Sequence, residues 1–374
     1  MASIFRLSIL TAVALLLLSA CSEPEPLRIG FSGQLSGPKS DLGVQGRNGA
    51  LLAVEEINAR GGVAGRKLEL IAEDDEDTPE GARQADARLV SRKVLAIIGH
   101  MTSGQTLAAL PDLAASGTIL ISPTTATPAL SEKTDLFFRV ITSNVQWARG
   151  LADFCAQSGH GRAFLLGDSD NAGYTDTFLE AFEKRYQEQG GQIAGRLFYS
   201  SRKAPDSEKL AQAIRAARPK ILVACVSARD LATLAQELRP RSLGIAVCGP
   251  PWPSTSDLIL VGGKEVEGFE FISNYTEDNT YPAFHAFRER YAKRFGWKPG
   301  FAAAFAYESV TVLAEALRRN EGRREGLERA LVRGQTLEGI IGPFILDETG
   351  DVRRPAFITR IQDGRLKTVA TTGQ

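Results

Sequence analysis

Histidine and cysteine, the side chains that bind most structural and catalytic zinc ions, are scarce in this sequence. Only three histidines and four cysteines occur among 374 residues, and they do not follow the short spacings of a zinc site. The motifs G-x-x-x-x-G-K, G-x-G-x-x-G and G-x-S-x-G, which mark phosphate-binding loops, dinucleotide sites and hydrolase nucleophiles, are missing too. These absences argue against an enzyme, and we expect neither a metal nor a cofactor.

A net charge is also lacking, because 44 basic residues balance 44 acidic ones. The densest basic stretches are the arginine pairs at Arg318–Arg319 and Arg323–Arg324, which are typical of a solvated helix end. A nucleic acid would require a basic face on the protein. We therefore expect no DNA or RNA partner.

One long apolar run is present, and it lies at the N-terminus. Arg6 precedes apolar residues from Ile9 to Leu18, a layout typical of a secretory signal and shorter than the roughly 20 apolar residues of a membrane-spanning helix. The run ends in Leu18-Ser19-Ala20-Cys21. This end resembles the bacterial lipobox, which implies removal of residues 1–20, lipid attachment to Cys21 and a short linker over residues 21–26. The alternative is an ordinary cleavage site with a chance cysteine.

The lipobox places the mature protein outside the cytoplasm, anchored by lipid at the periplasmic face of a bacterial membrane or at the cell surface. Three cysteines follow Cys21, an odd number that argues against a full disulfide framework. Cys225 and Cys248 each close a short apolar run. They could meet at neighbouring strand ends and form a bridge; buried free thiols are the alternative.

Short, continuous apolar runs alternate with amphipathic stretches along the chain. Continuous runs are typical of strands buried on both faces of a parallel sheet. Stretches such as Val44–Asn58 and Glu208–Ala217 repeat apolar residues at helical spacing. The alternation predicts βαβ units and an α/β fold with parallel sheets flanked by helices. The expected strands span residues 27–31, 68–72, 94–98, 119–121, 163–166, 221–226 and 245–247.

This alternation occurs twice, first up to about Val140 and again from about Arg162 to Val247, so we expect two lobes. The 354 residues that remain without the signal are also too many for one typical core. After Glu267 the pattern is mostly helical, and a late pair of strands is expected over 342–346 and 356–361. The late helices must pack back onto the lobes, which requires the chain to cross between them several times. Those helices are expected over 283–295, 301–318 and 325–332.

Polar residues follow the expected strands at their carboxyl ends, where open parallel sheets bind their ligands. Any one of these loops is explained by ordinary loop chemistry, but together, at one edge, they predict a binding site. The candidate ligand-binding residues in these loops are Leu35, Ser36, Ser103, Thr124, Thr125, Ala126, Asp168, Asp170, Tyr174, Ser227 and Trp252.

Several short motifs stand in a characteristic order, namely Gln34–Pro38, Ala53–Asn58, Ile98–His100, Ile121–Pro123 and Gly342–Pro343. In that order they resemble the leucine/isoleucine/valine-binding family of periplasmic binding proteins, which serve ABC transporters. The resemblance spans nearly all of the mature chain. It implies two Rossmann-like lobes, joined by a three-crossover hinge, that close on one small ligand. We expect lobe 1 to contain 27–141 and 274–334, and lobe 2 to contain 142–273 and 335–374.

The resemblance also assigns a ligand carboxylate to the first lobe. It implies that Ser103 and the loop beginning at Thr124 hold this carboxylate through N–H and O–H donors, which bind an anion best where water is excluded. The family's usual hydroxyl in that loop is replaced by Ala126, so only a backbone N–H is available there unless Thr125 or Thr127 supplies the hydroxyl.

In the second lobe the sequence departs further from the family. The acidic residue that pairs with a ligand ammonium is replaced by Pro251. A buried ammonium without a partner costs several kcal/mol, so either Asp168 or Asp170 substitutes, or the ligand has no ammonium. Tyr174 lies near the place of a family aromatic, and Trp252 either closes over an apolar ligand or packs at a lobe surface.

Other polar and aromatic residues are expected to be structural. We expect His100 to support loop geometry, Trp147 and Tyr275 to pack the hinge, and the acidic run Asp74–Asp77 to be a solvated strand end without calcium-site spacing. The resulting hypothesis is capture of a small anionic or zwitterionic ligand, amino-acid-like or an organic acid, for delivery to an ABC permease. The alternatives are a sensor read by a membrane receptor and, as a minor one, an enzyme on the same fold class.

Overall fold

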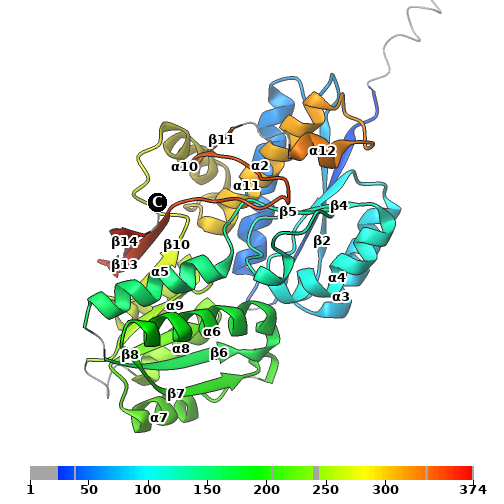
Figure 1. Cartoon of the computed structure of the whole chain (residues 1–374). Coiled ribbons are helices and arrows are strands. Elements are labelled where there is room, and N and C mark those ends of the chain that lie inside the picture. Colours follow the sequence, from blue (N-terminus) through cyan, green and yellow to red (C-terminus); the bar gives the residue numbers. More distant parts are fainter. Residues whose placement is uncertain are drawn as a thin grey trace, which may run out of the picture.

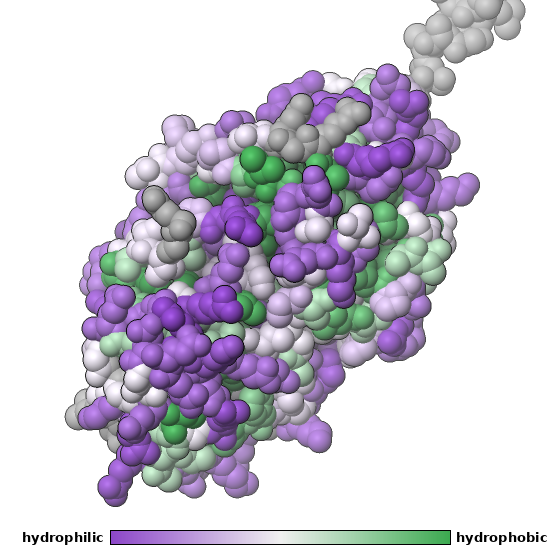
Figure 2. Space-filling view, in the orientation of Figure 1, coloured by the Kyte–Doolittle hydropathy of each residue, from purple (hydrophilic) through white to green (hydrophobic). Residues whose placement is uncertain are grey.

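The computed structural model describes residues 24–37, 39–159, 161–203, 205–238, 244–332 and 336–372. The expected signal and the lipobox Cys21 lie outside these residues. The described chain forms two lobes (Figure 1), one built mainly from the first 140 residues and one from the middle of the sequence. The visible face of both lobes is mostly hydrophilic, with scattered apolar patches (Figure 2). Within the described residues, every helix is too short or too polar to cross a membrane.

The first lobe contains a five-stranded parallel sheet in the order β2-β1-β3-β4-β5. Its interior strands are almost wholly buried, which explains their continuous apolar sequence. The strands are β1 Leu27–Gly33, β2 Leu68–Asp74, β3 Ala96–Ile98, β4 Ile119–Ser122 and β5 Phe137–Arg139. The helices between them are α2 Asp41–Ala59, α3 Pro79–Ser91 and α4 Ser103–Ser116.

The second lobe contains a seven-stranded sheet in the order β14-β13-β10-β9-β8-β6-β7. The strands from β6 to β10 pair in parallel, and β13 and β14 add antiparallel pairs at one side. The strands are β6 Arg162–Asp168, β7 Gln192–Tyr199, β8 Ile221–Cys225, β9 Ala246–Gly249, β10 Glu270–Ser273, β13 Ala356–Gln362 and β14 Arg365–Thr372. The helices are α5 Asn144–Gln157, α6 Ala172–Glu188, α7 Ser207–Ala217, α8 Ala228–Leu238 and α9 Ser256–Gly262.

The late helices pack on the first lobe, mainly against α2. They are α10 Pro282–Phe295, α11 Phe301–Arg319 and α12 Leu327–Leu331, followed by the short hairpin β11 Leu337–Gly339 and β12 Gly342–Phe344. Helix α11 packs along α2 (Figure 1). The two backbones approach so closely that a Cβ atom at Gly49 would lie 2.0 Å from the carbonyl oxygen of Ala303. Glycine is therefore required at this crossing.

The chain passes between the lobes after β5, after β10 and before β13, as the element order and sheet membership require. Two buried arginines hold the third passage to the first lobe. Arg139 of β5 lies 2.7 Å from Asp351, and Arg354 lies 2.7 Å from Glu308 of α11. Buried ion pairs are costly to break because one charge is left without a partner. These pairs therefore fix the passage at defined points.

The sequence-based prediction of the strands was incomplete in several places. Strands β5, β7, β11 and β14 were not predicted. Strands β5 and β11 are only three residues long, and β7 and β14 consist mainly of exposed and half-buried residues, so none of the four has a long continuous apolar run. The mostly helical pattern expected after Glu267 is wrong at β10, a four-residue strand whose residues are all buried.

Of the two alternatives for Cys225 and Cys248, the structure supports buried thiols and not a bridge between these two residues. Cys155, Cys225 and Cys248 are all buried thiols. The register of β8 and β9 places Val223, not Cys225, opposite Cys248, and the sulfur of Cys248 instead lies 3.7 Å from that of Cys155.

Candidate ligand site between the lobes

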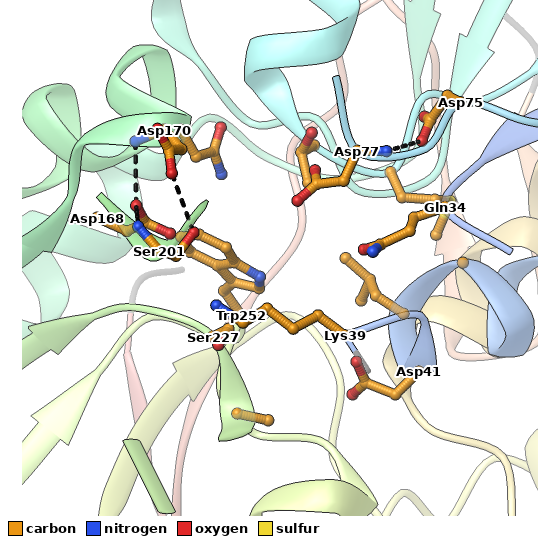
Figure 3. A pocket seen from close by; sticks show the side chains of 16 residues that line it. Gln34, Lys39, Asp41, Asp75, Asp77, Asp168, Asp170, Ser201, Ser227 and Trp252 are labelled. Atoms are coloured by element: carbon orange, nitrogen blue, oxygen red, sulfur yellow. Dashed lines mark hydrogen bonds between the residues drawn. The ribbon is translucent and has the colours of Figure 1, made fainter. Parts of the chain in front are cut away.

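The carboxyl ends of the parallel strands in the two sheets meet at a pocket between the lobes. The first part of this pocket, here called the acidic chamber, encloses about 620 Å³ of space that is partly open to solvent. Aspartates from both lobes surround it, with Trp252 on one side (Figure 3). Its charged and polar lining is Gln34, Lys39, Asp41, Asp75, Asp77, Thr102, Asp168, Asp170, Asn171, Ser201 and Ser227.

A second part, here called the apolar chamber, includes about 400 Å³ of space between protein atoms, part of it open to solvent, and is lined mainly by aromatic and aliphatic side chains. The two chambers adjoin, because five residues line both of them, namely Leu42, Met101, Thr102, Asn171 and Trp252. Among the described residues that line the apolar chamber, none carries a charge. They are Leu42, Met101, Thr102, Ser103, Thr124, Ile141, Trp147, Asn171, Tyr174, Pro251, Trp252, Phe301 and Phe305.

Ser103 is the first residue of α4 and one of the polar groups on the wall of the apolar chamber. Its side chain is only 1% exposed, and its Oγ atom has no hydrogen-bond partner in the structure. A buried hydroxyl left without a partner costs about 1–3 kcal/mol. The N-terminus of α4 also carries the positive end of the helix dipole, which favours an anion. Ser103 is therefore positioned to donate to a ligand.

The loop after β4 contributes one residue to the chamber. Thr124 lines it, and its hydroxyl donates to the carbonyl of Met101 at 2.7 Å. Thr125 and Ala126 are buried outside the lining; the Thr125 hydroxyl pairs with Thr106 at 2.7 Å. The Thr127 hydroxyl accepts from the N–H of Ala129. Neither Thr125 nor Thr127 thus places a hydroxyl in the pocket to replace the one missing at Ala126.

The two second-lobe carboxylates lie in the acidic chamber, not the apolar one. Asp168 accepts hydrogen bonds from the backbone N–H groups of Asp170 and Ser201, at 3.0 and 3.2 Å, and burial raises the pKa of its carboxyl. Burial also acts to raise the pKa of Asp170, but hydrogen bonds from Arg202 N–H and Ser200 lower it overall. These two carboxylates do not occupy the place of the missing acid at Pro251, which lines the apolar chamber.

The remaining candidate residues are divided between the pocket and its surroundings. Tyr174 lines the apolar chamber edge-on to Trp252, with ring centroids 6.0 Å apart. Ser227 lines the acidic chamber and accepts from Asp230 N–H. Leu35 and Ser36 lie outside both linings, where the N–H of Leu35 donates to a carboxylate oxygen of Asp74 at 2.9 Å.

Sequence reasoning missed several lining residues. Trp147, for which hinge packing was favoured over ligand contact, forms part of the wall together with Phe301 and Phe305 of α11. Phe301 and Phe305 lie four residues apart on one helix face, and this spacing is equally typical of residues in a hydrophobic core. The prediction that the Asp74–Asp77 run is a solvated strand end is wrong, because Asp75 is buried and Asp77 lines the acidic chamber.

Asp75 is buried because its carboxylate pairs with the imidazole of His100. The imidazole is 0% exposed, with Nδ1 3.2 Å from Asp75 and Nε2 3.0 Å from Asp86. Burial lowers the pKa of His100, but the nearby carboxylates of Asp86 and Asp75 outweigh it and raise the pKa overall. His100 is thus a buried cation that ties the loop after β3 to α3 and to the end of β2.

The lobes are in contact around the pocket, so the structure is the closed form. The hydroxyl of Thr255 donates to Asp41, and the N–H of Gly104 donates to Asn171. Further contacts between the lobes are the Lys39–Asp230 ion pair at 2.8 Å and a 2.8 Å hydrogen bond from Arg202 to the carbonyl of Asp77.

Comparison with known proteins agrees with this architecture. Residues 26–365 match the family model described as periplasmic binding protein, and the chain belongs to that family. The Leu/Ile/Val-binding protein homolog 3 of Brucella melitensis is 24% identical over 91% of this chain and 92% of the relative. The resemblance inferred from the sequence motifs is therefore confirmed at the level of the family.

Two solved structures share the fold. The leucine-binding protein LivK of Thermotoga maritima superposes with a TM-score of 0.85 at 23% identity, covering 92% of this chain and 98% of that one. A solute-binding protein of an ABC transporter from Rhodopseudomonas palustris BisB5, in complex with 3,4-dihydroxybenzoic acid, has a TM-score of 0.84 at 25% identity, covering 93% and 97%. The protein is thus an extracytoplasmic solute-binding protein and not an enzyme.

Proposed function

We propose that this protein captures a small carboxylate with an aromatic or branched apolar body and delivers it to an ABC transporter. The observation that carries the proposal is the buried, unpartnered hydroxyl of Ser103 on the wall of an uncharged, aromatic chamber. An anionic oxygen placed there accepts from Ser103 near the N-terminus of α4, in a site from which closure excludes water.

The rest of the chamber favours a ligand without an ammonium group. Trp147, Tyr174, Trp252, Phe301 and Phe305 offer ring faces and edges to an apolar body. An ammonium buried among these rings finds no carboxylate among the described residues that line the apolar chamber, and an unpaired buried ammonium costs several kcal/mol. We therefore rank aromatic monocarboxylates above zwitterionic amino acids. The benzoate-type ligand of the Rhodopseudomonas relative supports this ranking, and the name of the Thermotoga leucine-binding protein supports the second choice.

A thermal-shift screen of the mature chain tests the ligand class. Benzoate, 4-hydroxybenzoate and 3,4-dihydroxybenzoate are compared with leucine, isoleucine and dicarboxylates. A ligand at 100 times its Kd stabilises the folded state by about 2.7 kcal/mol, which gives a clear rise in Tm. We expect the benzoates to give the largest shifts. Larger shifts with branched-chain amino acids would overturn the ranking.

The role of Ser103 is tested by Ser103→Ala. We expect ligand affinity to fall by about 1–3 kcal/mol, because the mutation removes a donor from a buried anion. Ser116→Ala is the matched control, since Ser116 is exposed at the other end of α4, where its hydroxyl donates to the carbonyl of Leu113 and to the hydroxyl of Thr118. Isothermal titration calorimetry measures both variants. Equal affinities for Ser103→Ala and the unmutated protein would remove Ser103 from the site.

We also propose that Cys21 carries the lipid anchor and that residues 1–20 are removed. The sequence Leu18-Ser19-Ala20-Cys21 supports this. Metabolic labelling with a radioactive fatty acid is expected to mark the unmutated protein and not Cys21→Ser. Labelling of the variant would contradict the assignment. The lobe boundaries at 141/142, 273/274 and 334/335 stay a prediction as well.

A further inference from the structure

We propose that Cys155 and Cys248 form a disulfide bond in the exported protein, joining helix α5 to strand β9. Their sulfur atoms lie 3.7 Å apart, and both side chains are 0% exposed. The two thiols thus face each other inside the core of the second lobe. The bond goes beyond the ligand-binding function and does not depend on which ligand the protein takes.

The two sulfur atoms need to move only a short distance to form a bond. Bonded sulfurs are separated by about 2.05 Å, so the pair must approach by less than about 2 Å, which rotation of the two short side chains can supply. Helix α5 packs directly on β10, the strand beside β9, and this packing holds the two cysteines at that separation.

The third cysteine of the fold is set apart by strand register. Val223 of β8 lies opposite Cys248, which displaces Cys225 by two residues along the strand. Cys225 instead lies beside Thr175. The mature fold therefore contains one facing pair and one isolated buried thiol.

The bond forms by thiol–disulfide exchange. One thiolate attacks a sulfur of an external disulfide, either a protein oxidant or a small-molecule disulfide, and forms a mixed disulfide. The second protein thiolate then attacks the mixed disulfide at its protein sulfur and displaces the external group as a thiolate. In total the pair loses two protons and two electrons, and the external disulfide gains them and leaves as two thiols. Extracytoplasmic compartments sustain this chemistry. Because both sulfurs are fully buried in the fold, the exchange takes place during folding, and the folded state shields the finished bond from reductants.

The location gives the bond a structural role near the ligand pocket. It links residues 93 positions apart and closes a loop that contains β6, β7, β8 and the helices between them. Helix α5 carries Trp147, and β9 leads into Trp252, both of which line the apolar chamber. The bond therefore fixes two walls of the chamber relative to each other.

Thiol counting tests the proposal without requiring folded variants. The mature chain carrying Cys21→Ser is purified from the periplasm of a bacterial host, unfolded in guanidinium chloride, alkylated with or without prior reduction, and weighed by intact mass spectrometry. We expect one alkylated cysteine without reductant and three after reduction. Cys225→Ala should then give none, and Cys155→Ala two. Three alkylated cysteines without reductant would overturn the proposal, and so would none in Cys155→Ala, which would mean a Cys225–Cys248 bond instead.

A stability measurement adds a second test. Closing a long loop stabilises a fold mainly by restricting the unfolded chain, so we expect Cys155→Ala and Cys248→Ala to melt about 4–12 °C below the Cys225→Ala control under non-reducing conditions. The three variants each remove one buried sulfur, so cavity effects are matched. Equal melting temperatures would contradict the bond.

Discussion

Asp77 lies at the surface where the two lobes close, and its titration is expected to make ligand binding depend on pH. Burial, and after it the neighbouring Asp75, raises the pKa of its carboxyl from 3.8 to about 6. Groups from the second lobe also face it, since Asp168 raises the pKa and Arg202 lowers it, as does Lys39 on its own lobe. Opening of the lobes would remove the second-lobe groups and expose the carboxyl to water.

The direction in which ligand affinity changes with pH follows from this difference between the closed and open forms. A carboxyl with a higher pKa in the closed form binds its proton more tightly there, so protonation favours closure at low pH. The advantage is lost as the pH rises through about 6. If the pKa returned fully to 3.8 on opening, affinity would fall about fourfold between about pH 5.5 and 7.5. Asp75 stays beside Asp77 in both forms, so the pKa of Asp77 does not return fully to 3.8 on opening. We therefore expect affinity to fall about two- to fourfold over this pH range.

The assay is calorimetric titration with the carboxylate that gives the largest thermal shift, at several pH values across this window. We expect Asp77→Asn to flatten the dependence, since an amide does not titrate there. Asp112→Asn is the control, because Asp112 is an exposed residue of α4 remote from the pocket. Affinity that rises with pH, or an unchanged slope in Asp77→Asn, would refute the reasoning.

Two further predictions concern stability. His100→Ala leaves two buried carboxylates without their cation, and we expect the free energy of unfolding in urea to fall by about 3–5 kcal/mol; a loss below about 1 kcal/mol would show that the cluster is not charged as described. Because the pKa of His100 is raised in the fold, its contribution is complete below the ordinary value of 6.5 and declines at higher pH. Gly49→Ala directs a methyl group at the carbonyl of Ala303, and we expect a loss of about 1–3 kcal/mol, whereas Gly161→Ala meets open space and should stay within about 0.5 kcal/mol.

The buried strands and the polar edge of the sheets were predictable from the sequence because the signals are local. A continuous run such as Ile221–Cys225 reads as a strand buried on both faces wherever it lies. The edge strand Gln192–Tyr199 carries no such signal, since one side faces water and its pattern overlaps that of a loop or a helix. Its place was decided by pairing with β6.

The binding site divides in the same way. That Ser103, Thr124 and Trp252 lie at the pocket was predictable, because they stand within five residues of the ends of strands whose carboxyl ends meet at one edge. Trp147 and Phe305 were not, because an aromatic residue on a helix has the same sequence pattern in a core as on a pocket wall. Only the packing of their helices against the cleft shows that their side chains line the chamber.

The sequence by itself determined the α/β class, the two lobes and the family, because apolar periodicity and the order of motifs are properties of the chain alone. The tertiary structure decided which polar groups are buried together. Asp75 and His100, 25 residues apart, form a buried ion pair, and the partner of Cys248 is Cys155 and not Cys225. Such pairings depend on strand register and helix packing, and separation along the chain does not encode them.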